Sequence, residues 1–271
     1  MKIAMVTGPS SGIGLATAIE MAARGYHVVA AGRSEERTTK VVDQINDGIG
    51  SAEYLHLDLA SLRSCEQAAR AFLDSDRHLD VLIDNAGVGG VRGITEDGFE
   101  IAFGVNHLGH FMLTNGLRPA FRHGSRVVVV SSEVHRRADG IDFDEVRTKT
   151  GLLGGWAEYG VSKLANILFA RHLARLAPEL RTYSLHPGVA DTNIFPALVK
   201  PFFRNRRPPH EAAQTSVYCA TSDQVADQSG RYYSRMSLRE PSVVAQDDGL
   251  AAELWARSAQ WCGIGATDES H

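Results

Sequence analysis

The chain has 271 residues, a net charge of −4 and a pI near 6.3, which is long enough for one large α/β domain and gives no charge-based reason to expect a nucleic-acid partner. Its three cysteines, Cys65, Cys219 and Cys262, are widely spaced, so they favour a reducing compartment and argue against a disulfide framework or a zinc site. A first strand that begins at Lys2, and the lack of any apolar run of roughly 18 residues, predict a cytoplasmic protein with no secretory signal or membrane span.

The first elements enclose a glycine-rich turn. Residues 2–6 form an apolar run typical of a buried parallel strand, and residues 13–24 carry apolar side chains at helical spacing. The turn between them, Thr7-Gly8-Pro9-Ser10-Ser11-Gly12-Ile13-Gly14, is called the glycine loop below. Such a turn directs free backbone N–H groups and the positive end of a helix at one point, which attracts phosphate. A purely structural turn is the alternative, but its place in a strand-helix-strand unit favours a dinucleotide site.

The end of the second predicted strand, residues 27–31, indicates which dinucleotide is bound. An acidic residue near this point commonly holds the ribose hydroxyls, whereas an arginine accommodates a 2′-phosphate. Here Arg33 follows the strand and Arg37 lies one turn into the next helix, with Ser10 and Ser11 as further candidate contacts. We therefore predict NADP(H) as the preferred cofactor, with NAD(H) as the alternative, although Arg33 as an ordinary solvated charge is the competing interpretation.

Two further strands end in small or polar residues. The third predicted strand, residues 53–57, ends at Asp58-Leu59, and the fourth, residues 79–83, continues into Asn85-Ala86-Gly87. Ligands in open parallel sheets lie outside such carboxyl ends. Asp58 can either accept a hydrogen bond from an adenine amino group or cap the helix that starts near Ser61.

Residues 98–116 read as one long helix in which Asn106 lies among apolar neighbours, so its amide needs partners if it is buried. His107 and His110 share a helical face, but two histidines without a third ligand are more typical of packing or surface residues than of a metal site, and we predict no metal site. The β-branched fifth strand, residues 126–130, closes on Ser131-Ser132. Residues 133–153 are predicted to form a loop or short inserted helix over the sheet edge.

Tyr159 and Lys163 open a helix that extends to about Leu176, and their i,i+4 spacing places them side by side. A tyrosine titrates near 10, and a neighbouring cation favours its phenolate. Tyr159 can then protonate a carbonyl oxygen as hydride arrives, or deprotonate an alcohol as hydride leaves. Ser132 can orient and polarise the same oxygen, and the Asn106 amide can hold a water that relays protons to Lys163. Each residue alone is unspecific, but the set predicts oxidoreductase chemistry.

The last third of the chain contributes a sixth strand, residues 181–185, followed by His186-Pro187-Gly188-Val189. Residues 191–209 are predicted to form a substrate lid, with a packed loop or subunit contact as the alternative. This segment carries Phe195, Phe202 and Phe203 and the basic cluster Lys200, Arg204, Arg206 and Arg207. The chain is completed by a helix at 210–222, a strand near 232–233 and a helix at 249–261. We predict one domain, residues 1–262, because no Pro/Gly/Ser-rich linker divides it. Residues 263–271 are expected to be a disordered tail.

Together these motifs resemble the short-chain dehydrogenase/reductase family over nearly the whole chain. The resemblance implies an α/β fold with a single Rossmann-type, doubly wound parallel sheet of about seven strands in the order 3-2-1-4-5-6-7, with helices on both faces. It implies Tyr159 as acid/base, Lys163 on the nicotinamide ribose, Asn106 in the relay, and Ser132 rather than Ser131 as catalytic serine. The cofactor-binding positions it implies are Gly8, Ser10, Ser11, Gly12, Ile13, Gly14, Arg33, Arg37, Asp58, Leu59, Asn85, Ala86, Gly87, Asn106, Tyr159, Lys163, Pro187, Gly188, Val189 and Thr192.

The 27-residue separation of Ser132 and Tyr159 is about twice that of the commonest members and resembles the retinol dehydrogenase-like branch, as do residues 106–111 and 162–166. Membrane-bound members of that branch carry an N-terminal anchor, which we do not expect here, so a retinoid substrate is not expected either. The expected activity is NADP(H)-dependent interconversion of an alcohol and a carbonyl on a small hydrophobic molecule. A catalytically silent NADP(H)-sensing protein, or an epimerase or double-bond reductase of the same fold, are the alternatives. The family analogy also predicts a homodimer or homotetramer through the helices around Asn106 and Tyr159.

Overall fold

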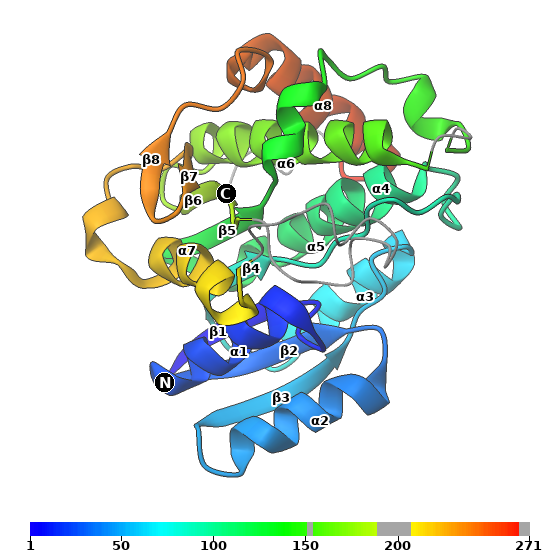
Figure 1. The fold of residues 1–271 in the computed structure, drawn as a ribbon. Coiled ribbons are helices and arrows are strands. Elements are labelled where there is room, and N and C mark those ends of the chain that lie inside the picture. The colour runs from blue at the N-terminus through cyan, green and yellow to red at the C-terminus, as the bar shows by residue number, and fades with distance from the viewer. Residues whose placement is uncertain (151–153, 189–206, 266–271) are drawn as a thin grey trace.

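The fold is built on one eight-stranded sheet, seen in a computed structural model that describes residues 1–150, 154–188 and 207–265. Its order is β3-β2-β1-β4-β5-β6-β7-β8 (Figure 1). Strands β1 to β7 pair in parallel, and β8 pairs antiparallel with β7. The strands are β1 (Lys2–Thr7), β2 (Tyr26–Gly32), β3 (Ser51–His56), β4 (Leu79–Asp84), β5 (Phe121–Val130), β6 (Arg181–His186), β7 (Arg231–Ser234) and β8 (Ser237–Arg239). The predicted sheet and its order are confirmed, and β8 adds a strand that was not predicted.

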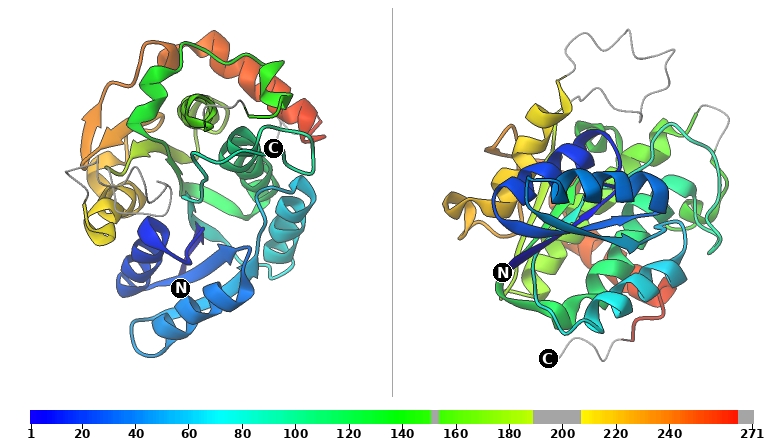
Figure 2. Two further views of the ribbon diagram at one scale, coloured as in Figure 1. Left: turned by 45° about the vertical axis from the view of Figure 1, so that its right-hand side comes forward. Right: turned by 90° about the horizontal axis from the view of Figure 1, so that it is seen from below.

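Helices cover both faces of the sheet (Figure 2). They are α1 (Gly12–Ala23), α2 (Glu35–Asn46), α3 (Leu62–Leu73), α4 (Ile101–Phe103), α5 (Gly109–Gly116), α6 (Trp156–Leu176), α7 (Pro209–Thr221) and α8 (Asp248–Trp261). The alternation of β5 shows how the two layers form: Val128 and Val130 pack with α1, α2 and α7, whereas Val127 and Val129 pack with α3, α5, α6 and α8. A strand buried on both faces needs such a continuous apolar run, which is why β5 was clear in the sequence.

The predicted helix at 98–116 is interrupted. Between α4 and α5 the chain makes a π turn, η1 (Gly104–Leu108), in which the N–H of Gly109 donates to the carbonyl of Gly104, five residues back. The π turn contains Asn106. The prediction of one uninterrupted helix is therefore wrong, and the break lies at a candidate site residue, where π turns are frequently found.

The segment after β5 contains two 3₁₀ turns, η3 (Glu133–Arg137) and η4 (Glu145–Arg147), which agrees with the predicted loop and short inserted helix. Most of the predicted lid lies outside the described residues, including its phenylalanines and Lys200, Arg204 and Arg206, and so do residues 151–153 and 266–271. Within the described ranges, no helix has the length and apolar character needed to cross a membrane.

Candidate active site

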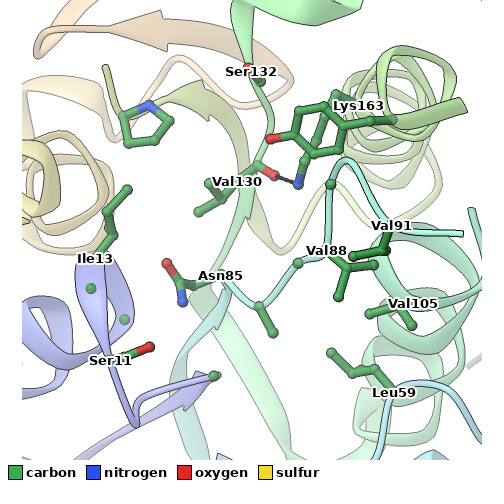
Figure 3. Close-up of a pocket in the computed structure, with 18 of the residues that line it drawn as sticks. Ser11, Ile13, Leu59, Asn85, Val88, Val91, Val105, Val130, Ser132 and Lys163 are labelled. Carbon is green, nitrogen blue, oxygen red and sulfur yellow. Dashed lines mark hydrogen bonds between the residues drawn. The ribbon is translucent and has the colours of Figure 1, made fainter. Parts of the chain in front are cut away.

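The carboxyl ends of β1, β2, β4, β5 and β6 open onto a cleft of about 820 Å³ (Figure 3). Most predicted site residues line it together: Gly8, Ser10, Ser11, Gly12, Ile13, Gly14, Arg33, Arg37, Asp58, Leu59, Asn85, Ala86, Gly87, Ser132, Tyr159, Lys163, Pro187 and Gly188. Asn106 is fully buried behind this lining. Val189 and Thr192 lie outside the described residues.

The glycine loop forms one end of the cleft. Gly8 and Gly12 have φ of +66° and +56°, values that favour glycine. A Cβ on Gly14 would lie 2.2 Å from the carbonyl oxygen of Gly8 and 2.5 Å from Nδ2 of Asn85, so only glycine fits there. Ser11 is the N-cap of α1, and its side chain makes no capping bond within the described structure. The first-turn N–H groups of α1 thus remain available to an anion in the cleft.

Hydrogen bonds tie the glycine loop to the turn after β4. The Thr7 hydroxyl accepts from the backbone N–H groups of Asn85 and Ala86, both at 2.9 Å, and Nδ2 of Asn85 donates to the carbonyl of Thr7 at 2.9 Å. The two turns that the sequence placed 78 residues apart therefore form one rigid edge of the cleft.

The far end of this edge carries Arg33 and Arg37, both exposed, where β2 passes into α2. The Ser34 hydroxyl caps α2 by accepting from the N–H of Arg37 at 3.4 Å. Ser61, not Asp58, caps α3 by accepting from the N–H of Ser64 at 3.2 Å, so the capping alternative for Asp58 is wrong.

At the centre of the cleft, Tyr159 and Lys163 lie on successive turns of α6, with Nζ of Lys163 5.6 Å from the Tyr159 ring centroid. Ser132 and Tyr159 both line the cleft here, and interaction with the Ser132 side chain acts to lower the pKa of the phenol. Nζ donates to the carbonyl of Val130 at 2.9 Å (Figure 3). The other serine, Ser131, donates to the Lys163 carbonyl at 2.7 Å and so supports the helix.

Burial sets the protonation states of this pair. It raises the pKa of Tyr159 to about 12, against the opposing effect of the Ser132 side chain, and it lowers the pKa of Lys163 to about 7. The net pKa of Tyr159 thus lies above that of an ordinary tyrosine, whereas the sequence analysis expected Lys163 to lower it. The physical reason is that loss of water disfavours the charged form of both groups, and a lysine with so low a pKa is only partly charged at neutral pH.

The Asn106 amide links two elements that flank the cleft. Its Oδ1 accepts from the N–H of Val88 at 2.8 Å, and its Nδ2 donates to the carbonyl of Val88 and to the Ser162 hydroxyl, both at 2.9 Å. Both N–H groups of the amide are committed to protein partners, so they do not hold the expected relay water. The amide instead fixes the turn after β4 against α6, and one lone pair of Oδ1 remains.

The two neighbouring histidines are packing residues, as predicted. Nε2 of His107 lies 2.8 Å from the Ser258 hydroxyl, and His110 bridges Thr7 and the carbonyl of Asn106. Burial lowers the pKa of both imidazoles, to about 3 and about 4 respectively, so both are neutral.

Trp156 was missed by the sequence analysis although it lines the cleft beside Tyr159. The two rings meet edge to face, with centroids 5.7 Å apart. Gly90 permits this position, because a Cβ there would lie 2.9 Å from Cζ2 of the indole. The three-residue spacing from Tyr159 was the available signal, since it places both side chains on one helical face. Val88, Val91 and Val134 complete an apolar wall on this side.

Known proteins resemble this chain in sequence and in fold. The family model described as short chain dehydrogenase matches residues 2–140. Retinol dehydrogenase 14 of Homo sapiens is 38% identical over 97% of this chain and 87% of its own length. A solved structure described as a putative uncharacterized protein from Mycobacterium paratuberculosis has a TM-score of 0.82 and 33% identity, covering 97% of this chain and 94% of its own. A putative NAD(P)-dependent gluconate 5-dehydrogenase from Beutenbergia cavernae, with bound NADP, has a TM-score of 0.69 and 28% identity, covering 86% and 94%.

Proposed function

Because the chain belongs to the short-chain dehydrogenase/reductase family, we propose that it uses NADP(H) to interconvert an alcohol and a carbonyl on a small hydrophobic molecule. Oxidoreduction of alcohols and carbonyls is the family's general chemistry. The observation that carries the proposal for this chain is that Ser132, Tyr159 and Lys163 line one cleft together with the glycine loop.

Tyr159 is proposed as the acid and base. Its pKa of about 12 keeps the phenol protonated at neutral pH, so it is ready to donate a proton to a carbonyl oxygen during reduction. The Ser132 hydroxyl is placed to hold the same oxygen. For alcohol oxidation the phenol must first lose its proton to solvent, and a charged Lys163 beside the ring would favour the resulting phenolate. We propose that Lys163 also binds the nicotinamide ribose, as the family resemblance implies.

Residues of this chain give the cleft features that suit a dinucleotide. The close approach at Gly14 and the available N–H groups of α1 suit a pyrophosphate, and a bound nicotinamide would supply or accept the hydride. Arg33 and Arg37 lie where a 2′-phosphate would bind, with no acidic residue at the end of β2 to repel it. This arrangement supports NADP(H) over NAD(H). Val189 and Thr192 stay proposed contacts to the nicotinamide.

The apolar wall around Trp156 supports a hydrophobic substrate, and the name of the human relative is consistent with an alcohol of that kind. From the lack of a long apolar run we further propose a cytoplasmic location. By analogy with the family we propose a homodimer or homotetramer that contacts its partner through the helices around Asn106 and Tyr159. Light scattering that shows only a 29.4 kDa species would reject the assembly.

The test is NADPH oxidation by the purified protein across a panel of aromatic and aliphatic ketones and aldehydes, with product analysis. We expect alcohol products, and a Tyr159→Phe variant that loses about 10²–10⁴-fold in turnover while NADPH affinity stays within twofold. Normal turnover by this variant would refute the mechanism. Tight NADPH binding without turnover of any carbonyl would favour the sensor, and an epimerised or saturated product would favour the related enzymes of this fold.

A further inference from the structure

Two buried imidazoles contact the main chain of proposed catalytic residues. Nδ1 of His135, in η3, lies 2.7 Å from the carbonyl oxygen of Ser132. Nδ1 of His110, in α5, lies 3.0 Å from the carbonyl oxygen of Asn106. Neither ring reaches the cleft, because both side chains are fully buried and neither lines it. The proposed chemistry does not use either ring, yet both adjoin its residues.

The partners of His135 leave one tautomer. A carbonyl oxygen only accepts, so Nδ1 must carry the hydrogen. Nε2 accepts from the backbone N–H of Ser242 at 3.1 Å and must therefore be bare. The ring is thus neutral, and it meets the Tyr232 ring edge to face with centroids 5.3 Å apart. One imidazole consequently connects the turn that presents the Ser132 hydroxyl to a segment more than a hundred residues later in the chain.

The same reasoning applies to His110. Nδ1 donates to the carbonyl of Asn106, so Nε2 is bare and accepts from the Thr7 hydroxyl at 2.9 Å. That hydroxyl has one hydrogen and receives two more from the N–H groups of Asn85 and Ala86, so its bonding is complete. The carbonyl of Ile83, at 3.4 Å, is the weaker competitor for its hydrogen. His110 thereby connects the π turn to the glycine loop.

We propose that His135 and His110 are positioning residues, each a neutral Nδ1–H imidazole that fixes the main chain of Ser132 and of Asn106 respectively. The proposal rests on the proposed function. Fixing the Ser132 peptide holds its side chain in the cleft that Tyr159 also lines. Fixing the Asn106 peptide holds the π turn, and the Asn106 side-chain amide is hydrogen-bonded to Val88 and Ser162. A displacement of about 1 Å in such groups can lower a rate by about 10².

Substitution of each histidine by asparagine or by glutamine tests the hydrogen bonds of Nδ1 and Nε2 separately. An asparagine N–H can take the place of Nδ1–H, and a glutamine carbonyl oxygen can take the place of bare Nε2. His135→Asn therefore keeps the bond to Ser132, whereas His135→Gln keeps the bond to Ser242. We expect kcat to fall about 10- to 100-fold in His135→Gln and less than about 5-fold in His135→Asn, with the KM for NADPH within twofold in both. The two variants should lose similar amounts of thermal stability.

For His110, the two variants should affect different measured quantities. His110→Gln loses the bond to Asn106 and should lower kcat, whereas His110→Asn loses the bond to Thr7 and should weaken NADPH binding several-fold. Equal kcat in the Asn and Gln variants at position 135 would show a packing role only and overturn the proposal there; the same equality at position 110, with unchanged NADPH binding, would overturn it for His110.

A second measurement does not depend on activity. Long-range ¹⁵N–¹H spectra of the wild-type protein at neutral pH report which ring nitrogen of each histidine carries the hydrogen. An Nδ1–H tautomer for both rings is expected, and an Nε2–H tautomer or a protonated ring at either position would overturn the proposal for that residue. If the wild-type protein fails to oxidise NADPH with any carbonyl of the panel, the proposed function would instead be overturned.

Discussion

Asp84 is a buried acid whose replacement should stabilise the protein. It is the last residue of β4, directly before Asn85, and its side chain is 0% exposed. Oδ2 accepts from the Thr114 hydroxyl at 3.0 Å, while Oδ1 has no hydrogen-bond partner among the described residues and lies 4.0 Å from Nε2 of His110. Burial raises the pKa of Asp84 to about 8. Asparagine has the same shape, keeps an acceptor for Thr114 and carries no charge, so we predict that Asp84→Asn is more stable than the wild type at alkaline pH.

The sign and size of the effect follow from proton linkage. Because the pKa of Asp84 is higher in the folded chain than in the unfolded chain, the folded state binds more protons between pH 4 and pH 8, and its stability falls as the pH rises through that window. An unfolded aspartate titrates near 3.9, so between pH 5 and pH 8 the wild type should lose on the order of 3 kcal/mol relative to the asparagine variant. The difference should become constant only about one pH unit above this pKa, where Asp84 is ionised in both states.

Urea unfolding of both proteins at pH 5 and pH 8 measures this difference directly. Asp43→Asn, an exposed change on α2, is the matched control and should shift neither value appreciably. The reasoning is refuted if the stability difference between wild type and Asp84→Asn is the same at both pH values, because a pH-independent gain would come from packing and not from the cost of ionisation.

Arg33→Ala should weaken NADPH binding about 10- to 100-fold and NADH binding less than about 3-fold, with the NADPH loss shrinking at high salt, whereas Lys40→Ala, an exposed change on α2, should change neither. Titration with both cofactors measures this, and equal kcat/KM for the two in the wild type would reject the role of Arg33. Because burial lowers the pKa of Lys163 to about 7, its charge is lost as the pH rises through neutrality. The affinity of the wild type for NADH should therefore fall over that pH range, whereas the affinity of Lys163→Met should not depend on pH. An unchanged pH dependence in the variant would contradict this. Gly14→Ala should abolish measurable cofactor binding and lower the melting temperature, since its Cβ would meet the Gly8 carbonyl at 2.2 Å, and retention of NADPH affinity would show that the glycine loop is free to move.

The parts of the fold with strong local patterns were predictable. Residues 126–130 predicted β5 because a β-branched run is typical of a buried strand, and the order of strands followed from the family resemblance. By contrast, β8 has three exposed residues and no apolar pattern, and it forms only because β7 offers an unpaired edge. The π turn was equally hidden, since the apolar pattern of residues 98–116 predicts one helix and the turn is revealed only by the backbone hydrogen bond from Gly109 to Gly104.

The site was predictable where chemistry is local and unpredictable where it depends on burial. The glycine loop, Ser132 and Tyr159 reach one cleft as expected, because each follows a recognisable strand end or helix start. The pKa values of Tyr159 and Lys163 were not predictable, since the depth of burial is a property of the whole fold. The commitment of the Asn106 amide to Val88 depends in the same way on two segments that meet only after folding.

The π turn also limits how the length of this helical segment can vary. A π turn closes its hydrogen bond over one residue more than an α-helical turn does, so the helix holds one extra residue near Gly104. The extra residue turns everything beyond it by about 100°. Phe103 before the turn packs in the cluster with Leu164 and Leu254, whereas Phe111 after it packs in the cluster with Phe169 and Trp255. Deletion of one residue would restore an ordinary helix and rotate one of these two surfaces out of its cluster, so length variation in this helix should be far more restricted than sequence variation.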